Sequence, residues 1–462
     1  MQLPARSAPD VVVIGGGVSG LTAAVSLAGS GYSVCLIEQK QHCGGRTYSF
    51  VERATGDEVD NGQHLMMGCY HSTLNYLAAI GAMPLVSVQE RLSVSFRHAD
   101  RGLFRLRSAA LPPPLNILAG LLRLKSLSFS QRLSLLRVGT ALLSAKPDSD
   151  ENLRAQTVTQ WLDTLGQSKE NKEYLWDILA IGTLNDSPDV VSAALFIKVL
   201  QSAFLGKKRD SSMVIPKRGL SVVLVDNAVE FLERNGGRVL TETTVERAEL
   251  DGMQISKLEL NSGAAVSPRA VVSAVPYFDL PRVFGGGTSA VLPETSSAGS
   301  FISSPIVTIH LWFDRSFVDE DFTALLDSPI HWVFNKSRIF EKESGGDYLS
   351  LVISGAGDFI AKEKEELLAL ALSELRRFYP ACGRASLVHS LVVKEKRATF
   401  SPRVGTESVR PSHATSVRNL FLAGDWTDTK LPATIEGAAQ SGYRCGALVR
   451  KFLEGASGDS AR

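Results

Sequence analysis

The chain has 462 residues, which is enough for two or three domains with a substantial core. Hydrophobic residues make up 44% and charged residues 21% of it, as in ordinary globular proteins, and the net charge of +1 argues against a nucleic-acid-binding protein. Its five cysteines show no CxxC spacing and no histidine cluster, which predicts free thiols in a reducing compartment and neither a disulfide framework nor a metal site. They are Cys35, Cys43, Cys69, Cys382 and Cys445.

The first predicted element is a βαβ unit over residues 10–38. An apolar strand leads into Gly15, Gly17 and Gly20, and an apolar helix and a second strand follow. Gly15 permits the tight turn, Gly17 lets the backbone approach a pyrophosphate, and Gly20 brings the helix close to the strands. Glu38 can accept hydrogen bonds from both ribose hydroxyls and would repel a 2′-phosphate, so the unit favours FAD or NAD over NADP. Residues 11–37 carry no charge, but their glycines and strand-turn-helix-strand pattern favour a cofactor site over a membrane span.

A second glycine pair follows directly, in Gly44-Gly45-Arg46. The backbone at Gly45 and the guanidinium of Arg46 would lie beside the same pyrophosphate. Together with the first motif and the C-terminal segment GDWTD (424–428), this sequence resembles the superfamily of FAD-dependent amine oxidases and phytoene desaturases. The stretches DNGQHLMMGCYH (60–71) and GDWTDTKLPATIEGA (424–438) resemble, within it, the bacterial squalene-associated flavoenzymes, the hydroxysqualene dehydroxylases.

The resemblance implies FAD as the cofactor and an α/β fold. A Rossmann-type FAD-binding domain of the amine oxidase kind (GR2 type) would be interleaved with an α+β substrate domain. The FAD-binding domain would comprise residues 1–95, 213–276 and 395–462, and the substrate domain residues 96–212 and 277–394.

The polar segment that begins at Asp60 would, by the resemblance, pass the flavin ring and contact it through Gly62. His64 would be the imidazole nearest the ring and is the first candidate for a catalytic acid, with Asp60 as the second. A histidine that is hydrogen-bonded for structure is the alternative interpretation. Asp428 and Glu436 are further carboxylates that could donate a proton.

Residues 74–80 predict a helix and 88–96 a strand that enters the second domain. The segment 101–147 then contains eight basic residues and no acidic one, with apolar residues at helical spacing over 115–124 and 133–143. Such a segment can lie on an anionic membrane, and a solvated basic face of the substrate domain is the alternative. Because the expected substrate is a lipid, we favour a cytoplasmic protein held peripherally at the inner face of the cytoplasmic membrane.

The middle of the chain alternates predicted helices and strands. Residues 190–204 predict a mostly apolar helix, which the resemblance places beside a hydrophobic substrate tunnel. The resemblance also places the Val245 backbone at the adenine edge. Further helices are predicted over 157–165, 174–181, 221–234 and 362–378, and strands over 255–260, 270–275, 303–314, 349–354 and 388–393.

The last motif is a strand over 420–423 that delivers Gly424 and Asp425 to the ligand-binding edge of a parallel sheet. Asp425 would accept a hydrogen bond from a ribityl hydroxyl, because a carboxylate does not favourably face a pyrophosphate. The helix that follows would direct backbone N–H groups near Ile435 toward the flavin N1/O2 edge.

The resemblance implies reductive dehydroxylation of hydroxysqualene to squalene, in squalene and hopanoid biosynthesis, with an external electron donor such as NAD(P)H. Two other enzyme activities use nearly the same motifs, namely a polyisoprenoid desaturase of the phytoene or squalene type and an amine oxidase-like flavoprotein oxidase. A flavin-holding protein without turnover is the alternative from another class.

Overall fold

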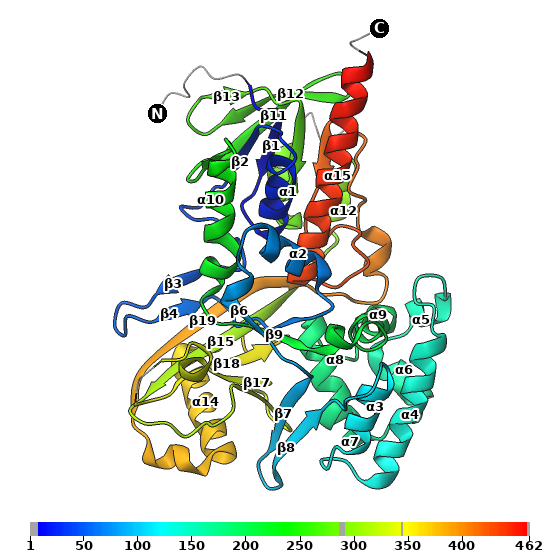
Figure 1. Cartoon of the computed structure of the whole chain (residues 1–462), viewed down its shortest axis with the longest axis vertical. Helices are drawn as coiled ribbons and strands as arrows, with labels where there is room; N and C mark the ends of the chain where they lie inside the picture. Colours follow the sequence, from blue (N-terminus) through cyan, green and yellow to red (C-terminus); the bar gives the residue numbers. More distant parts are fainter. Residues whose placement is uncertain (1–7, 286–291, 343–344, 460–462) are drawn as a thin grey trace.

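The structure, a computed structural model, describes residues 8–285, 292–342 and 345–459. Its upper part contains a five-stranded parallel sheet in the order β10–β2–β1–β14–β20 (Figure 1). Every residue of β1, β2, β14 and β20 is buried, as expected for parallel strands that are covered on both faces. The strands are β1 (Val11–Ile14), β2 (Val34–Ile37), β10 (Arg238–Leu240), β14 (Ala270–Ser273) and β20 (Leu420–Leu422).

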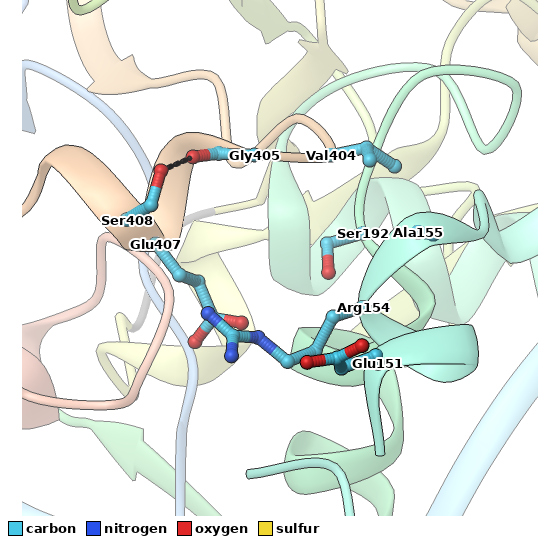
Figure 2. A pocket seen from close by; sticks show the side chains of 8 residues that line it. All are labelled: Glu151, Arg154, Ala155, Ser192, Val404, Gly405, Glu407 and Ser408. Atoms are coloured by element: carbon cyan, nitrogen blue, oxygen red, sulfur yellow. Dashed lines mark hydrogen bonds between the residues drawn. The ribbon is translucent and has the colours of Figure 1, made fainter. Parts of the chain in front are cut away.

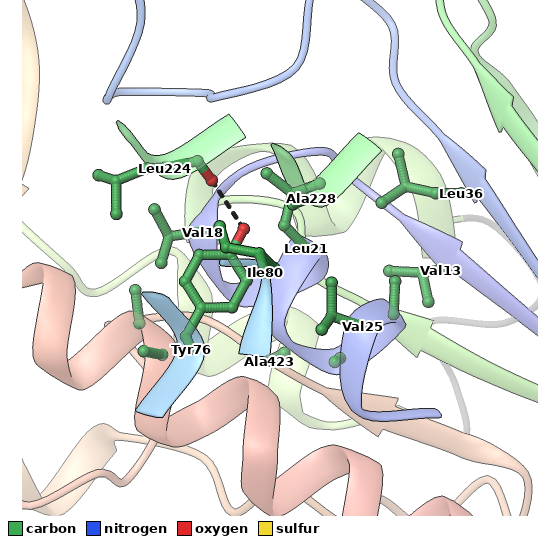
Figure 3. Close-up of a cluster of buried hydrophobic side chains, with 14 of the residues drawn as sticks. Val13, Val18, Leu21, Val25, Leu36, Tyr76, Ile80, Leu224, Ala228 and Ala423 are labelled. Atoms are coloured by element: carbon green, nitrogen blue, oxygen red, sulfur yellow. Dashed lines mark hydrogen bonds between the residues drawn. The ribbon is translucent and has the colours of Figure 1, made fainter. Parts of the chain in front are cut away.

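Helices cover one face of this sheet. They are α1 (Val18–Ala28), α2 (His71–Ala79), α10 (Asn227–Arg234) and α15 (Ile435–Asp459). Figure 3 shows the buried cluster between them, where the Tyr76 ring lies among aliphatic side chains and its hydroxyl donates to the Leu224 carbonyl oxygen at 2.7 Å. The other face packs against an antiparallel sheet of β11 (Val245–Asp251), β12 (Gln254–Leu260) and β13 (Ala265–Val266), and α11 (Leu280–Phe284) and α12 (Glu294–Ala298) extend this layer.

A mixed seven-stranded sheet forms the second part of the molecule, in the order β19–β15–β18–β17–β16–β7–β8. Alternate residues of β15, such as Ile309, pack toward α14 (Lys364–Phe378), so Ile306 and His310 belong to the opposite face. The strands are β7 (Ser93–His98), β8 (Gly102–Arg107), β15 (Ser303–Phe313), β16 (Phe322–Leu325), β17 (Trp332–Asn335), β18 (Tyr348–Ser354) and β19 (Leu387–Phe400).

A group of helices packs beside β7 and β8 around one apolar cluster (Figure 1). It comprises α3 (Leu115–Leu122), α4 (Phe129–Ser144), α5 (Glu151–Ala155), α6 (Val158–Thr164), α7 (Lys169–Asn171), a π-helical turn (Lys172–Trp176), α8 (Asp177–Leu184) and α9 (Ala193–Phe204). Among the described residues, no helix combines the length and the apolar character that a membrane crossing requires.

Two small sheets connect the two parts. One pairs β3 (Ser49–Val51) with β4 (Glu58–Asp60), and the other contains β5 (Met66–Met67), β9 (Met213–Pro216) and β6 (Val86–Val88). The chain therefore passes between the parts several times, and the architecture is the expected Rossmann-type α/β domain interleaved with an α+β domain. Strand β19 runs across the predicted domain limit at residues 394 and 395, and the domain limits stay predictions.

Three predicted elements differ from the structure. The helix predicted over 174–181 begins within the π-helical turn Lys172–Trp176 before α8. The strand predicted over 88–96 is two strands, β6 and β7, because the Gln89 side chain accepts from the Ser93 N–H at 3.0 Å and donates to the Ser93 carbonyl at 3.1 Å, closing a turn. The helix predicted over 221–234 begins as a π-helical turn, Val222–Asp226, before α10.

Candidate functional site

A cavity of about 560 Å³ lies where the carboxyl ends of β1, β2, β14 and β20 meet the seven-stranded sheet. One wall therefore comes from the parallel sheet and the other from Ile306 of β15 and residues 394–399 of β19. Most of the predicted site residues line it, namely Gly15, Gly17, Glu38, Gly45, Arg46, Gly62, His64, Val245, Gly424, Asp425 and Ile435. Gly20 and Asp60 lie behind the wall.

The glycine-rich turn presents bare backbone to this cavity. A Cβ atom added at Gly17 would have no heavy atom within 4 Å, so this residue faces open space. At Gly20 the same atom would lie 1.9 Å from the Gly15 carbonyl oxygen, which only glycine permits. Helix α1 begins after Gly17 without a side-chain cap, so its first N–H groups remain free for an anion. This wall fits the pyrophosphate of a dinucleotide.

Glu38 is buried and held by backbone donors at the end of β2. Its Oε2 accepts from the Gly16 N–H at 2.7 Å and its Oε1 from the Lys40 N–H at 2.9 Å. Each carboxylate oxygen has two lone pairs, so Glu38 retains acceptor capacity toward the cavity that it lines. The position and orientation suit an acceptor for ribose hydroxyls.

Arg46 and Asp425 form an ion pair across the cavity wall. The Arg46 Nη2 lies 2.7 Å from the Asp425 Oδ1, and its Nη1 donates to the Ala398 carbonyl at 2.9 Å. The two residues were predicted to face different parts of the cofactor, and the structure joins them. Asp425 thus lies near the glycine turn with its negative charge compensated.

The turn that carries Asp425 is organised by Arg410, which the sequence analysis missed. This buried guanidinium donates to the carbonyls of Asp425, Thr427 and Leu431 and to the Thr429 hydroxyl. Burial lowers the pKa of Arg410 to about 10. Nothing in the local sequence RPSH distinguished it from a surface arginine.

His64 lies on the cavity wall, and a hydrogen bond shows which of its ring nitrogens carries the proton. Its Nδ1 is 2.8 Å from the Gly62 carbonyl oxygen, and because a carbonyl only accepts, Nδ1 carries the proton. Burial lowers the pKa of His64 below its usual 6.5, so the ring is neutral near pH 7. Its Nε2 is then a proton acceptor.

Asp60 is a buried, fully paired carboxylate beside the cavity. The Lys336 Nζ lies 2.7 Å from its Oδ2, and Ser49 Oγ and the Leu220 N–H donate to its Oδ1 at 2.7 and 2.8 Å. Burial opposes its charge, but Lys336 and these donors outweigh burial and lower the pKa of Asp60. Lys336 also donates to the Gln63 Oε1 at 2.7 Å, which ties the 61–64 segment to α13 (Lys336–Ile339).

The other predicted proton donors are engaged elsewhere. Glu436 accepts from the N–H groups of Ser72 and Thr73 at the start of α2, each at 2.9 Å, and Asp428 pairs with Lys430 at 2.7 Å. Asn61, which was not singled out, lines the cavity with a buried Oδ1 that has no hydrogen-bond partner in the described part of the chain. It offers a ligand an acceptor, as a cofactor site requires.

A smaller cavity of about 220 Å³ lies between α5 and a 3₁₀ turn, η8 (Thr406–Val409), as Figure 2 shows. Arg154, Glu151 and Glu407 line it, and the Ser408 hydroxyl donates to the Gly405 carbonyl at 2.7 Å. It contains none of the predicted site residues, so the larger cavity is the candidate site.

Comparison with known proteins agrees with this geometry. The family model described as flavin containing amine oxidoreductase matches residues 18–449. A hydroxysqualene dehydroxylase of Rhodopseudomonas palustris is 30% identical over 95% of this chain and 98% of its own length. A 15-cis-phytoene desaturase of Narcissus pseudonarcissus is 25% identical over 96% of this chain and 80% of its own.

The fold has solved counterparts as well. The crystal structure of an oxidoreductase from Methanosarcina mazei matches with a TM-score of 0.74 and 16% identity, over 94% of this chain and 99% of that one. The matched family model runs from the start of α1, directly after the glycine turn, into α15, and so includes the cavity-lining residues from Val18 onward. The chain therefore belongs to the flavin-containing amine oxidoreductase family and is an FAD-dependent oxidoreductase.

Proposed function

We propose that this oxidoreductase converts hydroxysqualene, a long polyisoprenoid alcohol, into squalene, in squalene and hopanoid biosynthesis. The observation that carries the proposal is the match to the hydroxysqualene dehydroxylase of Rhodopseudomonas palustris, which extends over nearly the whole of both chains. In this reaction a C–H bond replaces an allylic C–O bond, and the hydroxyl leaves with a proton as water. FAD supplies the hydride chemistry, and an external donor, NAD(P)H in our proposal, restores the two electrons.

Each part of the proposed FAD cofactor has candidate contact residues on the cavity wall. The turn at Gly15 and Gly17 would receive the pyrophosphate, and Glu38 would receive the adenosine ribose. By the family resemblance, Gly45 and Arg46 would lie beside the phosphates, Val245 at the adenine, Gly424 and Asp425 at the ribityl chain, and Gly62 and Ile435 at the flavin ring. All of these residues line the cavity, which supports the assignment.

The substrate would lie on the side of the cavity that faces the helices. Leu65 and Met67, within three residues of His64 in sequence, pack against the apolar cluster of the helical group, and Ile306 lines the cavity. Apolar walls suit an isoprenoid chain and exclude water from the reacting carbon.

His64 is the proposed catalytic group, and Asp60 is given a positioning role. A neutral His64 cannot donate from Nε2, so as a general acid it must first take up a proton. Because its pKa lies below 6.5, dehydroxylation should accelerate as pH falls below 6.5 and slow as pH rises. Asp60 is ionised and paired with Lys336, and it holds the segment that carries His64.

The same unprotonated Nε2 favours one alternative, a polyisoprenoid desaturase. There a hydride and a proton leave neighbouring carbons, a C=C bond forms, and His64 would take the proton. That rate would rise with pH through the His64 pKa, opposite to the first proposal.

The test begins with protein whose flavin has been reduced anaerobically, to which hydroxysqualene is added. Squalene formation together with return of the flavin absorbance would support dehydroxylation. The pH profiles of the wild-type and His64→Gln rates then test whether His64 is the general acid. If the flavin stays reduced, and oxidised protein instead bleaches with squalene or phytoene, the desaturase is correct.

A peripheral membrane location is the last part of the proposal, through the basic segment 101–147. Helix α4 of this segment exposes three large apolar side chains, Phe129 at 69%, Leu133 at 43% and Leu143 at 64%. Apolar residues among uncompensated basic ones are typical of a surface that rests on an anionic bilayer. The inner face of the cytoplasmic membrane would supply such a bilayer.

A further inference from the structure

A third cavity, of about 530 Å³, lies in the basic segment, apart from the flavin site. Four arginines line it, and none of its lining residues is acidic. They are Arg91, Arg105, Arg107 and Arg123, and we call this the arginine cavity. The other lining residues are Ser108, Ala109, Ala110, Leu111 and Gly120.

Local structure explains why these arginines converge. Strand β8 alternates, so that Leu106 is buried and Arg105 and Arg107 share the exposed face. Helix α3 packs closely on the end of this strand, because a Cβ atom at Gly120 would lie 2.7 Å from the Arg107 carbonyl oxygen. The helix ends at Leu122, and its C-cap residue Arg123 therefore lies beside the strand.

The guanidinium groups have few partners of their own. Among the described residues, the one ion pair that any of the four makes is between Arg91 and Glu90, at 3.9 Å. The Arg91 Nε is buried without a hydrogen-bond partner in that same part of the chain, and the Arg105 Nε donates to Ser95 Oγ at 3.4 Å. Clustered positive charges repel one another, and a phosphate would relieve this repulsion through charge-assisted hydrogen bonds.

Exposed leucines lie on the elements that form the arginine cavity, and Leu111 lines it. Leu103 is 38% exposed, Leu111 43% and Leu115 50%, and they lie on β8, on the connection to α3 and at the start of α3. An anion-binding cavity next to exposed apolar side chains matches a ligand with a phosphate head and an apolar body.

The geometry points to the arginine cavity as a binding site for the phosphate of a phospholipid headgroup at the surface of an anionic membrane. The leucines around it would enter the edge of the acyl region. This inference rests on the membrane contact proposed above and gives that contact a specific site. It would also fix the orientation of the chain on the bilayer, with the β7–β8 hairpin and α3 against the lipid (Figure 1).

The test is flotation of the flavin-loaded protein with vesicles of phosphatidylglycerol and phosphatidylcholine, compared with phosphatidylcholine alone. Each basic residue near such a surface contributes about fivefold to binding, so Arg107→Gln combined with Arg123→Gln should weaken binding about 20-fold. The matched control combines Arg137→Gln with Lys146→Gln, which removes the same charge from the same segment but outside the cavity, and should cost no more than about fivefold. Equal losses in the two double variants, or no loss in the first, would overturn the inference.

Titration with inorganic phosphate and pyrophosphate distinguishes a soluble anion from a lipid. If these bind wild type but not the Arg107/Arg123 variant, and the vesicle binding of both proteins is equal, the cavity serves a soluble phosphate and the lipid assignment is wrong. Flotation requires no turnover, so it is independent of the reaction, which is tested separately on wild-type protein with hydroxysqualene.

Discussion

The two walls of the flavin cavity are built in different ways. The wall from the parallel sheet is backbone: a tight glycine turn, an uncapped helix start and a carboxylate that is itself held by N–H groups. The opposite side depends on side chains: the buried pair of Asp60 and Lys336, with the half-buried Gln63, holds the segment of His64. A backbone-built wall requires glycines at fixed spacing in the sequence. A side-chain-built wall requires charged residues that are distant in the sequence to come into contact.

The largest expected effects break the backbone-built wall at two glycines that differ in what surrounds them. Gly20→Val should prevent folding, because its Cβ would overlap the Gly15 carbonyl oxygen. Gly17→Val should fold but lose most of its FAD, because its side chain would extend into the cavity where the backbone must approach the pyrophosphate. Soluble yield and the flavin absorbance per protein measure the two effects.

Gly139→Ala is the control for these glycine variants. A Cβ atom there, within α4, would meet no heavy atom within 4 Å, and alanine favours a helix, so both readouts should stay at wild-type values. A Gly17→Val protein that retains its flavin would contradict the pyrophosphate assignment.

The contrast between the walls also explains what could be predicted from sequence. Glycine spacing is local, so the sequence could single out the turn at Gly15 and Gly17, the acid at Glu38 and the strand before Gly424. The structure brings these residues to one cavity, and their contacts with the cofactor stay predictions. The pairing of Arg46 with Asp425 spans most of the chain, and no local pattern encodes it.

Lys336 was missed for the same reason. It follows β17 in a stretch without a motif, and its importance comes from burial against Asp60, which is 276 residues away in sequence. Asp60 was singled out as a catalytic candidate from its neighbours alone, and the structure surrounds it with donors behind the cavity wall. Burial and long-range partners decide such roles, and a single sequence displays neither.

Lys336→Met breaks the side-chain-built wall and should lower the free energy of unfolding by about 3–5 kcal/mol. Asp60 would then be a buried carboxylate without its cation, since both side chains are 1% exposed in the ion pair. Thermal unfolding of the flavin-loaded protein measures the loss. Adding Asp60→Asn should recover part of it, because the second substitution removes the unpaired charge.

Lys257→Met provides the exposed comparison. Its partners Glu249 and Glu259 are more than one-third exposed, as Lys257 is, so this variant should unfold at a temperature close to that of wild type. Equal losses at Lys336 and Lys257 would show that the buried pair does not stabilise this wall.

The smallest expected effect, about 1.4 kcal/mol per pH unit for each of two histidines, sharpens the same comparison, because a side-chain-built wall should respond to pH where a backbone-built wall does not. His310 lies within this wall, with its Nδ1 3.1 Å from the Tyr348 hydroxyl, and burial lowers the pKa of His310 to about 3. Between that value and the ordinary 6.5, the unfolded chain binds a proton that the folded chain does not. Stability should therefore fall as pH decreases below 6.5 and level off near pH 3.

His331, whose pKa burial lowers to about 4, adds a second proton that the unfolded chain binds and the folded chain does not. Urea unfolding between pH 4.5 and 7 measures how steeply the free energy of unfolding depends on pH. In His310→Asn, and separately in His331→Asn, this slope should be smaller by the equivalent of about one bound proton. Unchanged slopes in both variants would place the acid sensitivity outside this sheet.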